Sequence, residues 1–460
     1  MRRAGPGQGI AIACPVVFGR RLLVLLLVLA AIGVPAGVLR AACAGKSCPA
    51  EVAQARVPFC PLPAELKAKL AAGFREGRSP DVMAVTGNHA VAGTAGAGPW
   101  PSVTAASRVT AVPIAFFGTG IEPAAVVPRG MGLDAIAPTL ADVLGFRRPH
   151  PDVRVGTAVA DIANGERPRL VLEVAWKGVG TQELRDDPRS WRSLRSLMAR
   201  GAATVAGDTG SLPLDPAATL TTIGTGGLPS QHGITGALVR NDHGRVVRAW
   251  GPGAPFSVIA TLPDDLDQAM DQRPLIGLVA SDEADRGIVG GNWYIGHDRD
   301  TMVVATGGSA VPAAEKLLAE GFGRDAVPDI LAVVLDGSVS SIDRRTQELV
   351  AAAERAAGGS VAVAIAGTGG GSGTDAGSTD GDRIRVPDIV SQVDAGVPGD
   401  PNVVAGAVSG GLFLDQGALA KEGISGDAVV QATMGVTTPD GTRVFEDAFQ
   451  GFAVSFGKYC

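Results

Sequence analysis

Short apolar runs recur along most of the chain. Residues 112–118, 170–175, 275–280, 330–335 and 361–366 consist mainly of Val, Leu, Ile, Ala and Phe. Continuous apolar runs of this length are typical of strands that are buried on both faces of a parallel sheet. We therefore predict that these five runs are the strands of a mostly parallel central sheet.

The intervals between the runs have the apolar spacing of amphipathic helices. The pattern predicts helices over 62–77, 133–144, 190–201, 217–225, 310–321 and 344–357, and a short strand over 81–86. Alternating strands and helices define an α/β fold whose sheet is covered by helices on both faces. Residues 367–382 are low in complexity and predict a surface loop, whereas residues 384–460 show no clear pattern.

An apolar run from Leu22 to Leu39 follows four arginines near the N-terminus. A helix of this length rises about 27 Å, close to the thickness of a bilayer core, and the preceding arginines place the N-terminus in the cytoplasm. A cleaved signal peptide is the alternative, and both interpretations export the domain. The predicted organisation is a cytoplasmic segment 1–21, an anchor or signal peptide 22–42, a linker 43–62 and an ectodomain 63–460.

Five cysteines agree with export. Cys14 precedes the apolar run, while Cys43, Cys48, Cys60 and Cys460 follow it. An even number of cysteines in an oxidising compartment favours disulfides, and four cysteines allow three pairings. We expect a local Cys43–Cys48 bridge and a Cys60–Cys460 bridge that joins the ends of the domain, with free thiols as the alternative.

The charge balance narrows the range of partners. The formal net charge is −6, with 40 Lys and Arg against 46 Asp and Glu, and basic residues cluster only at the N-terminus. A general nucleic-acid-binding protein would carry a basic patch. The expected partners are therefore the membrane, through the N-terminal helix, and a small anion or another envelope protein, but no nucleic acid.

The most specific motif is the segment 215–236, DPAATLTTIGTGGLPSQHGITG. Its Thr225-Gly226 pair, Leu228-Pro229 and His232-Gly233-Ile234 resemble the nucleophile segment of the alkaline phosphatase superfamily, especially type I phosphodiesterases and nucleotide pyrophosphatases. In that family a Ser or Thr nucleophile opens the helix ten residues before the Gly. The resemblance implies an alkaline-phosphatase-like α/β fold.

Other segments resemble the same family, but one of them is out of order. The run 170–178 is similar to the family's first strand, and residues 168–370 resemble its N-terminal core. Residues 80–160, with the loop 93–99, resemble the family's C-terminal part although they come first in this chain. We therefore predict a circular permutation of the fold. The alternative is that 80–160 forms a separate small domain.

The family's chemistry needs two divalent metal ions, zinc or manganese, and a hydroxyl that attacks phosphorus. At the nucleophile position this chain has Pro216, which has no hydroxyl. Proline suits the first turn of a helix, and Asp215 before it is a suitable N-cap. Lys177-Gly178 replaces the family's Asp-Gly, and an ammonium there would repel a metal ion.

The remaining metal positions are equally changed. They align with Val339, Asp343, Gly367, Thr368 and Gly96, of which only Asp343 is a strong ligand type. We expect His232 to make a structural hydrogen bond and Thr219, Thr221 and Thr222 to pack in the helix. The acidic group Asp282, Glu283 and Asp285 predicts a solvated loop, and His297 beside Asp298 is an outside candidate for metal binding.

Lys177 would lie where the strands end, beside the start of the nucleophile helix. Such sheets bind ligands at this edge, and a helix N-terminus favours anions. The expected degenerate pocket comprises Lys177, Asp215, Asp343, Thr368 and His232. It either binds an anion or is closed by a salt bridge from Lys177 to Asp343 or Asp215. The expected function is a non-catalytic exported protein without a cofactor, and the alternative is a metal-dependent phosphodiesterase or nucleotide pyrophosphatase with atypical ligands.

Overall fold

The computed structural model describes residues 57–87, 90–92, 99–104, 106–291, 293–294, 300–370, 383–399 and 402–460. Residues 58–460 form one compact unit. This unit starts earlier than the predicted ectodomain boundary at residue 63, because Phe59 and Leu62 are packed in the core with exposures of 2% and 4%. The predicted anchor, residues 22–42, lies outside the described residues, and none of the helices described is long and apolar enough to cross a membrane.

The larger sheet has seven strands in the order β5-β3-β11-β4-β10-β8-β9. Neighbouring pairs from β11 through β9 run parallel, and β3 runs antiparallel to both β11 and β5. This confirms the predicted α/β fold with a mostly parallel sheet. The strand bounds are β3 Ala111–Gly118, β4 Leu170–Trp176, β5 Ala202–Asp208, β8 Ile276–Ala280, β9 Thr301–Val304, β10 Asp329–Leu335 and β11 Val361–Gly367.

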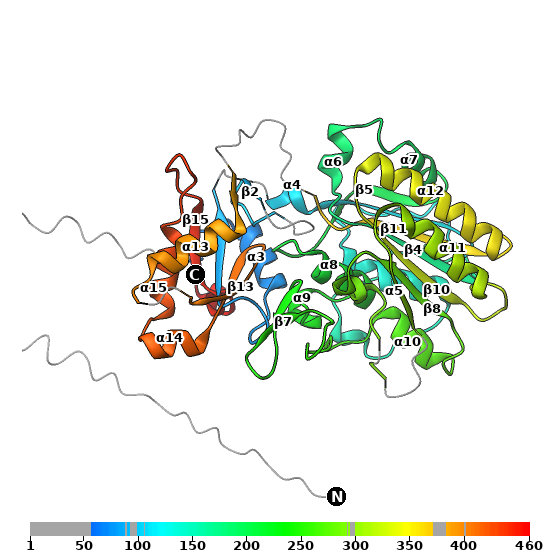
Figure 1. Cartoon of the computed structure of the whole chain (residues 1–460). Coiled ribbons are helices and arrows are strands. Elements are labelled where there is room, and N and C mark those ends of the chain that lie inside the picture. Colours follow the sequence, from blue (N-terminus) through cyan, green and yellow to red (C-terminus); the bar gives the residue numbers. More distant parts are fainter. Residues whose placement is uncertain are drawn as a thin grey trace, which may run out of the picture. The chain divides into compact units, whose positions relative to one another are not determined.

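Helices cover both faces of this sheet, as predicted, and Figure 1 shows the two layers. One apolar core joins the sheet to α5, α8, α10 and the 3-10 turn η3, and a second core joins its other face to α6, α7, α11 and α12. The bounds are α5 Ile136–Leu144, α6 Thr181–Asp186, α7 Arg192–Met198, α8 Pro216–Thr225, α10 Leu262–Ala269, η3 Glu283–Ile288, α11 Ala310–Glu320 and α12 Val339–Ala356.

The position of β3 shows whether residues 80–160 form a separate domain. β3 and α5 precede β4 in the chain, yet β3 lies inside the sheet between β5 and β11. The block 80–160 is therefore not a separate small domain, because its strand pairs with strands from much later in the sequence. The circular permutation remains a prediction, and it accounts for a sheet interior built from the early part of the chain.

A second, antiparallel sheet has the order β13-β14-β1-β15. Its strand β1, Val82–Thr86, comes from the start of the unit and the other three come from its end. Side chains alternate along β1: Val82 and Ala84 face a core with α13 and α15, while Met83 and Val85 face a core with α3 and the C-terminal turn η6. The remaining bounds of the elements around this sheet are α3 Ala64–Gly73, β13 Val404–Val408, β14 Gly411–Leu414, β15 Phe445–Gln450, α13 Val386–Gly396, α14 Gln416–Glu422, α15 Gly426–Met434 and η6 Gly451–Tyr459. Two short helices are α4 Ala106–Thr110 and α9 Pro229–His232. Two strand pairs form small sheets of their own: β2 Ala90–Ala92 with β12 Arg383–Arg385, and β6 Leu238–Arg240 with β7 Val246–Arg248.

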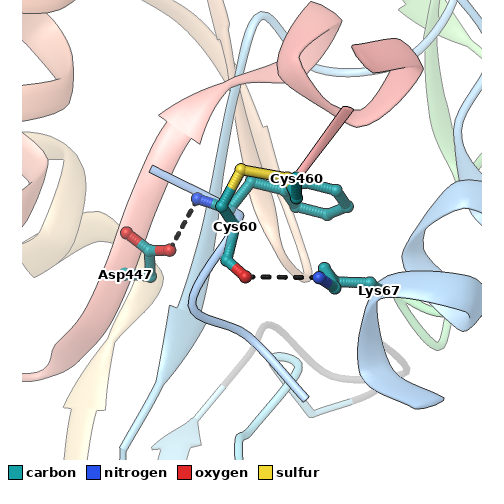
Figure 2. The surroundings of a disulfide bond; sticks show 5 residues. Cys60, Lys67, Asp447 and Cys460 are labelled. Carbon is teal, nitrogen blue, oxygen red and sulfur yellow. Dashed lines mark hydrogen bonds between the residues drawn. A yellow bond between two sulfur atoms is a disulfide. The ribbon is translucent and has the colours of Figure 1, made fainter. Parts of the chain in front are cut away.

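A disulfide joins the two ends of the folded unit. Cys60 and Cys460 are bonded, 400 positions apart in sequence, which confirms the predicted bridge. Around it, Lys67 donates to the Cys60 carbonyl over 3.2 Å and Asp447 accepts the Phe59 N–H over 2.8 Å (Figure 2). Closing a loop of this length restricts the unfolded chain strongly. Cys43 and Cys48 lie outside the described residues.

Candidate functional site at the carboxyl ends of the strands

Several polar residues meet where the parallel strands end. Lys177 and Gly178 follow β4, Thr368 follows β11, and η3 with Asp285 follows β8. In sheets of this type the loops after the strand ends form the ligand-binding edge. α8 begins at Pro216 and packs against η3 on one face of the sheet. The structure therefore brings part of the predicted pocket together.

Asp215 and Pro216 build the start of α8. Asp215 has extended backbone angles and its Oδ1 accepts the Ala217 N–H over 2.9 Å, so it is the N-cap, as predicted. Pro216 occupies the first helical position, where a missing N–H is not needed. The helix start keeps its structural role without a nucleophilic oxygen. Because the carboxylate already accepts from the helix N-terminus, an incoming anion would have to displace it.

Lys177 is paired with Asp285. Its Nζ lies 2.8 Å from both carboxylate oxygens, and the two side chains are 12% and 2% exposed. The predicted salt bridge to Asp343 or Asp215 was therefore assigned to the wrong partner. The expectation of a solvated loop at Asp285 was also wrong: Asp282 caps η3 by accepting from the Ala284 N–H, and the turn directs Asp285 into the protein.

The ammonium of Lys177 balances more than one carboxylate. Burial raises the pKa of Asp285 to about 6, and the charge and hydrogen bonds of Lys177 hold it from rising further. Burial also raises the pKa of Asp215, against hydrogen bonds from α8 and the positive charge of Lys177. Desolvation disfavours the charged form of a buried acid, whereas a nearby cation favours it. Lys177 is thus a local counter-ion for the acids at this edge.

A second lysine–aspartate pair lies at the same edge of the sheet. Lys69 of α3 places its Nζ 2.6 and 2.5 Å from the two carboxylate oxygens of Asp208, at the end of β5, and 3.0 Å from the Thr110 hydroxyl. β5 runs parallel to β11, because both are antiparallel to β3. The pair connects the helix beside the second sheet to the strand ends of the first.

Thr368 fastens the ends of two neighbouring strands. Its Oγ1 accepts the Gly178 N–H over 2.9 Å, and its own N–H donates to the Trp176 carbonyl. The side chain is 3% exposed. Thr368 therefore lies beside Lys177, as the predicted pocket requires, but its hydroxyl holds the backbone that carries the lysine.

His232 and the threonines of α8 have structural roles. His232 is fully buried; its Nε2 lies 3.1 Å from the Thr222 hydroxyl and its Nδ1 accepts the Ile234 N–H. Burial lowers its pKa to about 3, which keeps the ring neutral. Thr219 and Thr221 donate to the carbonyls one turn back, at Asp215 and Ala217. The expected structural hydrogen bond of His232 is confirmed, and its inclusion in an open pocket is not.

Asp343 does not belong to the site. It lies in α12, which packs on the face of the sheet opposite α8. Its two oxygens accept the N–H groups of Ser193 and Leu194, over 2.9 and 2.7 Å, at the start of α7. Asp343 was predicted as a remnant of a metal ligand pair, and in the structure it satisfies the free N–H groups of a helix terminus.

The residues at this edge do not fit a two-metal centre. The Lys177 ammonium is in contact with both oxygens of Asp285, the carboxylate that a cation would need, and Pro216 has no oxygen to direct at phosphorus. Within the described ranges, no group of three or more His, Cys, Asp or Glu side chains is placed to hold a metal ion. The positions of Gly96 and His297 lie outside those ranges.

One buried acid near the site went unrecognised in the sequence. Glu173 lies in the middle of β4, where it pairs with Ala332 and Ala364 of the neighbouring strands, and it is 3% exposed. Its Oε1 has no hydrogen-bond partner within the described part of the chain. Burial raises its pKa to about 8, opposed by the charge of Arg148. The sequence could have shown that this acid is buried, because Glu173 is the only charged residue of the apolar run 170–175.

Comparison with known proteins gives one distant likeness. The chain is similar to two crystal structures of the alkaline phosphatase PafA, the wild type and a multiply substituted mutant. Each shares 13% identity and a TM-score of 0.40 with this chain, covering 62% of this chain and 85% of the other. No protein-family model and no curated protein matches the sequence. This is a likeness to an alkaline phosphatase-like fold, and no residue role is carried over from it.

Proposed function

We propose that this chain is an exported, membrane-anchored protein of alkaline phosphatase-like fold that does not hydrolyse phosphoesters and serves as a binding protein at the cell envelope. The observation that supports this most directly is the Lys177–Asp285 pair. A monovalent, hydrogen-bonded ammonium occupies the position at the end of β4 where the chemistry needs a metal-binding carboxylate. The proposal does not extend to the phosphodiesterase subfamily.

The charges at the site argue against a small anion as its ligand. Lys177 is neutralised by Asp285, and the start of α8 is capped by Asp215. Both of the groups that would attract an anion therefore already have acidic partners. The predicted anion site would require a ligand to compete with carboxylates held in place by the fold.

Hydrolysis assays with the purified chain test the catalytic part of the proposal. The substrates are an aryl phosphate monoester and an aryl phosphodiester, each with zinc or manganese and with a chelator. We expect no metal-dependent turnover, because Pro216 has no hydroxyl at the first position of α8 and Lys177 pairs with Asp285. Turnover that requires metal and disappears with chelator would instead establish a phosphodiesterase with atypical ligands.

A metal-binding titration tests the role of Lys177 itself. In Lys177→Asp the ammonium is replaced by a carboxylate beside Asp285 and Asp215, which are hard oxygen ligands. We expect calorimetry to show tighter zinc or manganese binding by this variant than by the unmodified chain. Lys316→Asp, on the exposed surface of α11, makes the same charge change and is the control. Equal binding by the two variants would contradict the assignment of Lys177 as the substitute for a cation.

A further inference from the structure

Two aromatic side chains project from the last turn of the folded unit. Phe452 and Phe456 of η6 are 50% and 57% exposed, and their rings lie edge to face with centroids 6.2 Å apart. Phe452 also borders a cavity of about 410 Å³ whose lining is mixed: Phe74, Leu419 and Ile424 lie beside the charged side chains of Glu76, Asp81 and Arg240. The two adjacent exposed rings form a small apolar patch, and such a patch marks an interaction site more often than scattered exposed residues do.

The turn that carries these rings is held firmly. Val454, between them, is 5% exposed and packs in the core with Phe59 and Phe449. The Gly451 N–H donates to the Asp81 carbonyl over 2.7 Å, and Cys460 is bonded to Cys60. Chain ends are usually frayed unless they are tied down. The exposed rings therefore belong to a fixed surface.

The same turn lies where the chain enters the folded unit. Phe59 contacts Gly457, and the next residue, Cys60, is bonded to Cys460 (Figure 2). Upstream, residues 40–57 connect this point to the apolar run Leu22–Leu39. A connection of this length spans at most about 60 Å even when fully extended. A bilayer that holds the run is therefore within reach of the turn.

We propose that Phe452 and Phe456 insert into the surface of the bilayer that carries the anchor. The inference rests on the membrane anchorage in the proposed function. Residues 451–460 contain one charged residue, Lys458. The contact is therefore mainly apolar. It forms with zwitterionic lipid, and salt concentration has little effect on the binding. Two rings bind a bilayer weakly by themselves, but the anchor keeps the domain at a high local concentration beside it.

The test uses the full-length chain reconstituted in phosphatidylcholine vesicles. Phe456→Trp places a fluorescent ring in the proposed contact, and Val126→Trp places one at a loop position that is 75% exposed and remote in sequence. With brominated lipid in place of ordinary lipid, we expect fluorescence from Phe456→Trp to fall at least twofold more than fluorescence from Val126→Trp. Equal quenching of the two variants, after subtraction of the native tryptophans, would overturn the proposal.

Two further measurements separate the possible failures. Retention of the chain in membranes after an alkaline wash measures anchorage alone, and its loss overturns the anchor together with this contact. Sedimentation of residues 58–460, the compact unit, tests a second copy as the occupant of the patch. A dimer that Phe452→Ser with Phe456→Ser dissolves would assign the rings to self-association and overturn the lipid contact. A monomer in both forms, together with selective quenching, supports it.

Discussion

Asp285 and Glu173 are acids buried against the same face of the large sheet, but among the described residues only Asp285 is in direct contact with a cation. Asp285 is 1% exposed and contacts Lys177 through both oxygens, whereas Glu173 is 3% exposed and one of its oxygens has no hydrogen-bond partner among the described residues. Burial raises the pKa of Asp285 to about 6 and that of Glu173 to about 8. At similar depth, the partner decides which carboxyl stays charged at neutral pH.

The contact between Lys177 and Asp285 also fixes the polar groups at the carboxyl ends of the strands. Each of the two charges has its partner there, so neither side chain is left buried and unpaired. Glu173 is protonated in the neutral range and remains a cost to the fold.

Removing the lysine should be the most damaging change. Lys177→Met leaves Asp285 buried without a counter-ion, and breaking a buried pair in this way costs about 3–5 kcal/mol of unfolding free energy. Urea unfolding at neutral pH measures the loss. Arg344→Met removes an exposed ion pair with Glu348 and should change stability by less than about 0.5 kcal/mol. The double variant Lys177→Met with Asp285→Leu should recover most of the loss, and a loss no larger than that of the control would contradict the role given to Lys177.

Replacing Glu173 by a neutral residue should instead stabilise the fold. Glu173→Gln keeps the shape of the side chain but cannot ionise, so it should raise the unfolding free energy by about 2 kcal/mol at pH 7.5. Near pH 4.5 the substitution should change little, because Glu173 is then protonated in the folded state. Glu320→Gln, on the exposed surface of α11, is the matched control. A destabilised Glu173→Gln at pH 7.5 would show that Glu173 has a partner that supports its charge.

The two acids should affect the unfolding free energy over different pH ranges. These effects are smaller than those of the substitutions above. A carboxyl whose pKa is raised on folding supports the fold fully below its unfolded pKa, and this support is lost as the pH rises towards the folded value. For Asp285 the window runs from 3.8 to about 6, and for Glu173 it runs from 4.5 to about 8. The slope is at most about 1.4 kcal/mol per pH unit for one group.

Thermal unfolding between pH 6 and pH 8 isolates the Glu173 window. The unmodified chain should lose stability as the pH rises through it, and Glu173→Gln should flatten this part of the curve. Asp285→Asn should leave the curve between pH 6 and pH 8 unchanged, because the Asp285 window ends at about pH 6, the lower limit of that range. Parallel curves for all three proteins would show that neither carboxyl has the shifted pKa described here.

Most strands of the large sheet could be predicted from the sequence, whereas in the small sheet only β1 was predicted. β4, β8, β10 and β11 are buried along their whole length and, apart from Glu173 and Asp329, consist of apolar residues and Gly, so each strand has a local signal. β5 and β9 lie at the edges and are half exposed, and β13 to β15 pair across long stretches of sequence. The pairing of such strands depends on contacts that no short window of sequence contains.

The site divides in a similar way. The cap at Asp215, the proline at the start of α8 and the hydrogen-bonding role of His232 follow from short-range patterns. The partner of Lys177 does not, because Lys177 and Asp285 are 108 positions apart. The position of Asp343 was misjudged for the same reason, since its carboxylate reaches a helix 150 positions away.

By itself, the sequence determined the fold class, the absence of a side-chain hydroxyl at Pro216 and the cysteines that close the unit, because each depends on residue type or local periodicity. Only the tertiary structure decided that Lys177 pairs with Asp285, that β3 lies inside the sheet and that one oxygen of Glu173 has no hydrogen-bond partner among the described residues. These outcomes depend on which side chains meet across the sheet, and burial then makes each charge depend on the neighbour it meets.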